Sequence, residues 1–272
     1  MSLKRFFHFF NFSNIFVAFC VLSLTVSSEV LLDTANYTIS QFVFFATLFT
    51  YNFQRVIKFK QRKKHLQKKW QENNKISTYL IMITGGMMSA YHFYYFQTNT
   101  QIAIIFSGIL SVLYPFGIRK TPFSKIFIIA LIWTISSMFL LILENNILIN
   151  QNIILHLIAR FLFIFAITIP FDIRDLKFDD KKMKTIPIVF GERKARLIGL
   201  MALFFAEIIT IVQLLHFSLP YHHLIALICI FFLSAILIIK STQDKTAIYF
   251  SFWVESLSIY FYLFLMLSTL LF

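Results

Sequence analysis

The amino-acid sequence contains nine apolar segments of the length needed to cross a lipid bilayer. The hydrocarbon core is about 30 Å thick, and a helix of about 20 residues spans it. Because 58% of the residues are hydrophobic and 36 of the 272 are Phe, the bilayer rather than water must be the main solvent. We therefore expect an all-α, polytopic membrane protein in which residues 1–272 form one integral membrane domain. The segments are 12–30, 39–56, 76–96, 101–117, 126–143, 153–171, 197–215, 219–239 and 248–271.

Lys and Arg residues are confined to alternate connections between these segments. All but one of the 25 lie before the first segment or in every second connection after it, and the intervening connections contain none. In membrane proteins, cytoplasmic loops carry the excess of Lys and Arg. The pattern predicts a cytoplasmic N-terminus and a C-terminus outside, and it is compatible with a bacterial inner membrane.

The formal net charge of +13 raises the question of a nucleic-acid partner, because residues 55–70, RVIKFKQRKKHLQKKW, are basic with interspersed aromatics. Next to a membrane segment, such a cluster satisfies the orientation rule. It also attracts anionic lipid, by about 1 kcal/mol per basic residue. We predict membrane lipids and no nucleic acid as partners. Cys20 and Cys229 lie within apolar segments and have neither a metal-type nor a redox-type spacing.

An acidic stretch, FDIRDLKFDD at residues 171–180, follows the sixth apolar segment. Asp172, Asp175 and Asp179 recur at spacings of three and four, so they share one face if the helix continues. Mg²⁺ takes one or two carboxylates and fills its other positions with water or phosphate oxygens, which indicates a phosphate or diphosphate substrate. Spacing alone equally allows a solvated loop in which the acids pair with nearby cations, namely Arg174, Lys177, Lys181, Lys182 and Lys184.

Residues 172–191, DIRDLKFDDKKMKTIPIVFG, resemble the second aspartate-rich motif of the UbiA-type intramembrane prenyltransferases. These nine-helix proteins move an isoprenoid chain from its diphosphate to an acceptor. The resemblance places Asp175 and Asp179 on the metal-binding pair, with the catalytic candidate Asp172 one turn earlier. It implies Mg²⁺ as cofactor, an isoprenyl diphosphate as donor and an aromatic or lipophilic acceptor. It also implies a bundle around an apolar cavity, capped by the cytoplasmic segments after helices two and six.

A second segment is similar to the family's diphosphate site. Tyr114, Arg119 and Lys120 resemble the tyrosine and basic residues that face the substrate diphosphate after the fourth helix. An interfacial aromatic residue followed by basic residues would also satisfy the membrane-orientation rule by itself. The resemblance implies that these three residues bind the diphosphate.

The first aspartate-rich motif departs from the family's pattern. The family reads Asn-Asp-x-x-Asp-x-x-x-Asp, and residues 52–60 read NFQRVIKFK. Asn52 is retained as a diphosphate-binding candidate. Phe53, Val56 and Lys60 stand at the three aspartate positions. Half of the usual clamp of carboxylate-bound metal ions around the leaving diphosphate is therefore missing.

Fixed cations offer a replacement for the missing half. We hypothesise that Arg55, Lys58 or Lys60 contacts the diphosphate directly, while Asp175 and Asp179 hold a single Mg²⁺. Two alternatives stay open. A relative without transfer chemistry would bind an isoprenoid lipid or a protein partner, and a transporter would use the buried charges to conduct a solute.

Three charged residues lie well inside the apolar segments, away from their ends, namely Arg160, Glu207 and Glu255. Charges at such positions are costly and mark candidate functional sites. Arg160 is 12 residues, or about 18 Å of helix, from Asp172, too far to join the same cluster. We expect an ion pair between Arg160 and Glu207 or Glu255. The alternative is that one of these groups orients the acceptor or removes its proton.

Overall fold

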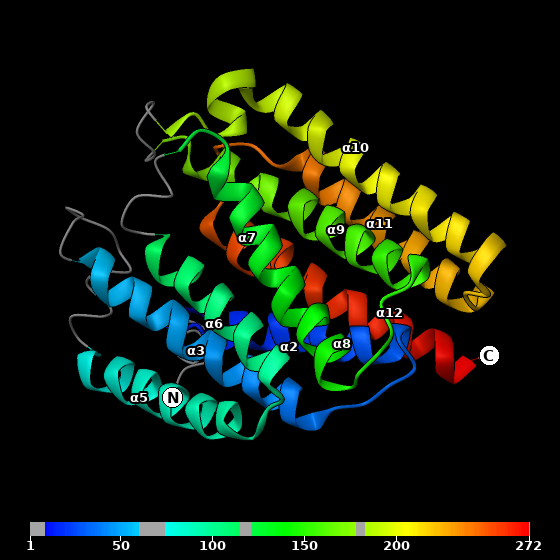
Figure 1. Ribbon diagram of the computed structural model, residues 1–272. Helices are drawn as coiled ribbons and strands as arrows, with labels where there is room; N and C mark the ends of the chain where they lie inside the picture. Colours follow the sequence, from blue (N-terminus) through cyan, green and yellow to red (C-terminus); the bar gives the residue numbers. More distant parts are fainter. Residues whose placement is uncertain (1–8, 60–73, 115–120, 178–182, 272) are drawn as a thin grey trace.

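The computed structural model describes residues 9–59, 74–114, 121–177 and 183–271, and within these ranges the chain is helical and has no β-strand (Figure 1). Two π-helical turns, η2 and η4, interrupt α-helical segments. The elements are α2 (Ile15–Leu31), α3 (Tyr37–Phe59), α5 (Lys75–Tyr95), α6 (Thr98–Leu113), α7 (Ser124–Thr134), η2 (Ile135–Phe139), α8 (Leu140–Glu144), α9 (Gln151–Asp175), α10 (Ile186–Phe217), α11 (Tyr221–Lys240), η4 (Tyr249–Val254) and α12 (Leu257–Leu271).

Every apolar segment expected from the sequence is helical in the described ranges, which confirms the all-α fold class. Within the described parts of the chain, five helical stretches are long and apolar enough to cross a membrane: Ser124–Glu144, Gln151–Asp175, Ile186–Phe217, Tyr221–Lys240 and Tyr249–Leu271. The helices α2 and α6 are apolar but shorter. The chain is thus an integral membrane protein, whereas the count of nine crossings stays a prediction, as do the orientation of the termini and the bacterial inner membrane.

With α7, η2 and α8 taken as one continuous stretch, successive helices run in opposite directions, so their ends gather at two opposite ends of the bundle (Figure 1). α3 and α9 terminate at the same end, and α7 and α10 begin there. We call this end the motif end, because both aspartate-rich motif positions of the sequence lie there. Most of the expected cap after helices two and six falls on residues 60–73 and 178–182, outside the described residues.

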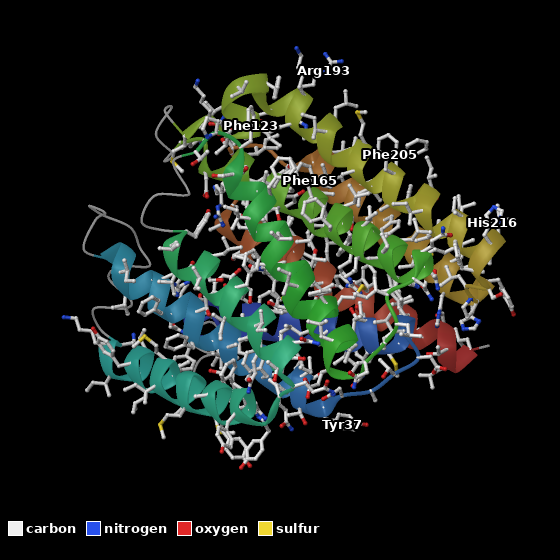
Figure 2. The ribbon with its side chains drawn as sticks, in the orientation of Figure 1. Tyr37, Phe123, Phe165, Arg193, Phe205 and His216 are labelled. Carbon is white, nitrogen blue, oxygen red and sulfur yellow. The ribbon has the colours of Figure 1, made fainter. Side chains whose placement is uncertain are left out.

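The helix α9 lies at the centre of the packing, against α7, α10 and α11. Its side chains Phe163, Ile164 and Ile169 are buried in the largest hydrophobic cluster. In contrast, Phe204 and Phe205 on the outer side of α10 are exposed, and Figure 2 shows Phe205 pointing away from the bundle. Exposed aromatic groups of this kind suit contact with lipid rather than water.

The helices α3 and α5 approach each other closely at Gly85. A Cβ atom at this position would lie 2.9 Å from the backbone oxygen of Phe45, so only glycine permits the approach. α5 continues unbroken from Lys75 to Tyr95. A transporter's binding site is commonly formed by helices broken near the membrane midplane, and the Gly85-Gly86 pair makes no such break.

The start of α10, which follows the α9–α10 connection, is shaped by a proline and a glycine. Pro187 lies in the first turn of α10, a position that needs no backbone N–H. Gly191 then has a φ of 79° and kinks the helix, a conformation that side chains with a Cβ rarely adopt. In the connection itself, the Lys184 carbonyl accepts a hydrogen bond from the Phe123 N–H at 3.3 Å. This bond holds the start of α7 beside the α9–α10 connection.

Candidate functional site

Asp172 and Asp175 lie on one face of the last turn of α9, as their spacing predicts, and share one cation. The Nζ atom of Lys125, in the first turn of α7, lies 2.7 Å from Oδ1 of Asp172 and 3.0 Å from Oδ2 of Asp175. The three side chains are 8%, 1% and 20% exposed for Lys125, Asp172 and Asp175. The two carboxylates and the ammonium group therefore form one largely buried cluster.

Sequence reasoning missed Lys125. It lies 50 residues from Asp175 along the chain, and local spacing reveals only neighbours on the same helix. Its charge was counted only as part of the pattern that sets membrane orientation. The signal that could have found it is its place at the start of an apolar segment, just after the Tyr114–Lys120 region that resembles the diphosphate site.

Arg174 adds a second cation to Asp175. Its Nε atom lies 2.9 Å from Oδ1 of Asp175, and its guanidinium carbon lies 5.2 Å from the ring centroid of Phe171 and 5.9 Å from that of Phe250. The sequence alternative expected nearby basic residues to pair with the acids in a solvated loop; Arg174 does pair with Asp175, but at the end of a helix and largely buried. Lys177 instead pairs with Asp244 at 2.9 Å.

Asn52, the retained residue of the first motif, is fully buried. Its Nδ2 atom donates to the carbonyls of Leu48 at 2.8 Å and Ser13 at 3.1 Å, and its Oδ1 atom accepts from Nδ2 of Asn14 at 3.0 Å. Asn14 precedes α2 and has a φ of 63°. In this arrangement Asn52 fixes the start of α2 against α3, and its predicted contact with a diphosphate stays a proposal.

Arg55 lies one turn after Asn52 and donates from Nη1 to the carbonyl of Phe12. The carboxylate of Glu255, directly after η4, interacts electrostatically with Arg55 on α3 and with Arg174 on α9. Glu255 thus lies within electrostatic range of both helices that carry the motif positions, without a side-chain hydrogen bond to either arginine. A π-helical turn directly before this residue is a feature often found at functional sites.

Tyr114 is buried at the end of α6. Gln54 donates from Nε2 to the Ser111 carbonyl at 2.9 Å, which joins α3 to α6 at the same level. The structure thus places Tyr114 at the motif end, close to the first motif. The remaining predicted site residues, Asp179, Lys60, Arg119 and Lys120, lie outside the described residues.

Arg160 does not form the expected ion pair with Glu207 or Glu255. Its Nη2 atom instead donates to the hydroxyls of Ser27 at 2.9 Å and Ser28 at 3.0 Å, and its guanidinium carbon lies 4.4 Å from the ring centroid of Phe261. For Glu255, the reason is its distance from Arg160 along the axis of α9. Glu255 interacts with Arg174, and Arg174 lies 14 residues, or about 21 Å, from Arg160.

A small cavity adjoins the guanidinium group of Arg160. The cavity has a volume of about 10 Å³, and its lining includes the polar side chains of His156, Thr210 and Gln213. Polar surroundings of this kind suit an ordered water. This polar group is separate from the carboxylate cluster at the motif end.

The sequence matches the UbiA prenyltransferase family over residues 71–265, which is most of the chain. The chain belongs to the UbiA prenyltransferase family. The match contains the second aspartate-rich motif and the Tyr114 segment, and it starts after the altered first motif. A comparison with curated protein sequences found no match.

Solved UbiA structures share the fold over nearly the whole chain. A UbiA homologue from Archaeoglobus fulgidus, bound to GPP and Mg²⁺, is 14% identical with a TM-score of 0.63, and the match covers 96% of this chain and 98% of that one. A digeranylgeranylglyceryl phosphate synthase is 12% identical with a TM-score of 0.63, covering 99% and 100%. An apo UbiA homologue from Aeropyrum pernix K1 is 11% identical with a TM-score of 0.60, covering 100% and 98%.

The described part of this UbiA site does not fit a Mg²⁺ clamp. Among the described residues, no group of three His, Cys, Asp or Glu side chains is placed to hold a metal ion. Between Asp172 and Asp175 there is already an ammonium group. Among the described residues, Lys125 and Arg174 already pair with Asp172 and Asp175. A single Mg²⁺ on Asp175 and Asp179 stays a prediction, since Asp179 is outside the described residues.

Proposed function

We propose that this UbiA family member is an intramembrane prenyltransferase that transfers an isoprenyl group from an isoprenyl diphosphate to an aromatic or lipophilic acceptor. The observation that carries this proposal is the charged network at the motif end of an otherwise apolar bundle, built by α3, α7, α9 and the segment after η4. The similar structure with bound GPP supports the class of donor.

The network suits a donor whose head is charged and whose tail is apolar. The isoprenoid tail would lie among the apolar helices, and the diphosphate would lie at the motif end. In the reaction, the allylic C–O bond breaks and its electron pair leaves with the diphosphate. A nucleophilic atom of the acceptor then forms the new bond to carbon and loses its proton. Fixed cations placed where negative charge develops are the strongest source of catalysis for such a step.

Individual residues have distinct expected tasks. Arg55 and Arg174 approach the motif end from α3 and α9 and would face the leaving diphosphate. Glu255 has no side-chain hydrogen bond to any residue in the described ranges. We therefore assign Glu255 the role of accepting the proton that the acceptor substrate loses. Because Lys125 and Arg174 are already paired with carboxylates, we expect Lys60, Arg119 and Lys120 to supply the added positive charge that a diphosphate needs.

Binding of labelled geranylgeranyl diphosphate to the purified protein in detergent tests the donor site. We expect saturable binding that Arg55→Met weakens about tenfold, or about 1.4 kcal/mol, a size typical of a lost charged hydrogen bond. The matched control is Arg193→Met, because Arg193 is exposed on α10 (Figure 2). Absence of binding for isoprenyl diphosphates of every length tried would overturn the proposal.

A relative without transfer chemistry is the second candidate, and the altered first motif favours it. The missing acids at Phe53, Val56 and Lys60 remove half of the family's usual charge stabilisation. This candidate predicts the same binding but no diphosphate release in the presence of membrane lipid extract. Measured release, dependent on an acceptor, would exclude it.

A further inference from the structure

The carboxylate pair on α9 is bridged by a side chain of the same protein. An ammonium group has three N–H donors and no acceptor, so Lys125 can satisfy one oxygen of each carboxylate at once, at 2.7 Å and 3.0 Å. We propose that Lys125 is a built-in cation that takes the place of a divalent metal ion between Asp172 and Asp175, and that the site binds its diphosphate without Mg²⁺. The second half of this proposal rests on the proposed function, and it is an alternative to the sequence-based expectation of a single Mg²⁺ held by Asp175 and Asp179.

Lys125 and a metal ion exclude each other at this position. Mg²⁺ binds carboxylate oxygens at about 2.0–2.1 Å in near-ideal octahedral geometry and keeps several waters. The space next to Oδ1 of Asp172 and Oδ2 of Asp175 is taken by Nζ of Lys125. A divalent ion there would also stand next to a like charge in a largely buried setting, where the repulsion is weakly screened.

Burial makes the ammonium a permanent part of the cluster. Asp172 is 1% exposed and Lys125 is 8% exposed. Neither side chain can therefore rotate toward water without leaving the other charge buried and unpaired. The start of α7 is also fixed by the backbone bond from Phe123 to Lys184 at 3.3 Å. The Lys125 side chain is therefore less free than that of a surface lysine to move away from the two carboxylates.

The first motif also lacks its family carboxylates and has basic residues nearby. Its three family aspartates are replaced by Phe53, Val56 and Lys60, and Arg55 lies between them. Arg55 donates to the carbonyl of Phe12 and interacts electrostatically with Glu255. The described parts of both motif regions thus contain buried or partly buried side-chain cations, Arg55 in the first and Lys125 and Arg174 at the second. Such cations bind phosphate oxygens without an ion.

Mn²⁺ binding to the purified protein, measured by electron paramagnetic resonance without any isoprenoid, tests the role of Lys125. We expect no site in wild type, in Lys125→Arg or in the control Lys177→Ala. Lys125→Ala should gain one Mn²⁺ ion, and Lys125→Ala/Asp172→Asn should lose it again. Mn²⁺ bound by wild type and abolished by Asp172→Asn overturns the proposal, and so does a folded Lys125→Ala that gains no ion. The wild-type comparison decides even where Lys125→Ala fails to fold.

Binding of geranylgeranyl diphosphate in excess EDTA or in Mg²⁺ tests the second half. We expect dissociation constants within twofold of each other. A loss of affinity of tenfold or more in EDTA overturns metal-independent binding. If wild type binds neither Mn²⁺ nor any isoprenyl diphosphate while Lys125→Ala gains the ion, the assignment of Lys125 is supported and the proposed function is overturned.

Discussion

Asn14 donates a hydrogen bond at 3.0 Å to Asn52, and this buried pair joins the start of α2 to the end of α3. Asn52 is the only position of the altered first motif where the family residue is retained. Its amide nitrogen also bonds the carbonyl of Ser13. The family residue is therefore kept here with a structural task, whatever contact it makes with substrate.

Asn52→Ala should lower the free energy of unfolding by about 1–3 kcal/mol, because it leaves the buried Asn14 amide and the Ser13 carbonyl without their partner. Thermal unfolding in detergent measures the effect. Asn99→Ala, at an exposed position of α6, is the control and should change little. An Asn52→Ala variant as stable as wild type would show that these bonds do not hold α2.

Gly85→Ala should destabilise the protein by about 1–3 kcal/mol, since the added methyl group meets the Phe45 backbone and forces α5 away from α3. Gly108→Ala provides the matched control, because nothing lies within 4 Å of a Cβ atom there. It should be neutral or up to about 1 kcal/mol more stable, as expected for alanine in a helix. Equal effects of the two substitutions in thermal unfolding would contradict the observed packing.

Ser27→Ala/Ser28→Ala should cost about 1–3 kcal/mol of stability, because both hydroxyls accept from the buried guanidinium of Arg160. Arg160→Met removes the buried charge together with its desolvation penalty and should be nearly neutral or stabilising. Ser23→Ala, whose hydroxyl bonds only within its own helix, is the control. A lower melting temperature for Arg160→Met than for Ser27→Ala/Ser28→Ala would show that Arg160 stabilises the bundle beyond these bonds.

Glu255→Gln should tighten the binding of geranylgeranyl diphosphate several-fold, because it removes a negative charge that interacts with Arg55 and Arg174. The same substitution should slow transfer if Glu255 accepts the proton of the acceptor. Glu207→Gln on α10 removes the same charge from another helix and should leave binding unchanged. Weaker binding by Glu255→Gln would mean that Glu255 holds the two arginines in place for the substrate.

The helices could be predicted because lipid imposes one strong rule on each of them, a run of apolar residues of spanning length. The details of these helices could not be predicted from the sequence. The left-handed conformation of Asn14 and the π-helical turn before Glu255 depend on packing between helices. Arg160 illustrates the limit, since the sequence shows its charge but not its height relative to Glu255, and the expected pair was wrong.

The site could be predicted where its residues are close in sequence. Asp172 and Asp175 share a cluster because three residues make almost one helical turn. Lys125 joins them only through the packing of α7 on α9, a contact that no local spacing reveals. The basic charge at the start of α7 had a sufficient explanation in membrane orientation, and that explanation concealed its pairing.

The transfer of label from geranylgeranyl diphosphate to a lipophilic acceptor tests directly whether the protein is a prenyltransferase. Wild-type protein in liposomes is supplied with the labelled donor and a membrane lipid extract, and the lipophilic products are separated from free prenyl alcohol. We expect a labelled product, formed with release of one diphosphate per molecule and strongly reduced in Arg55→Met but not in Arg193→Met. No product and no diphosphate release, from protein that binds the donor, would contradict this expectation.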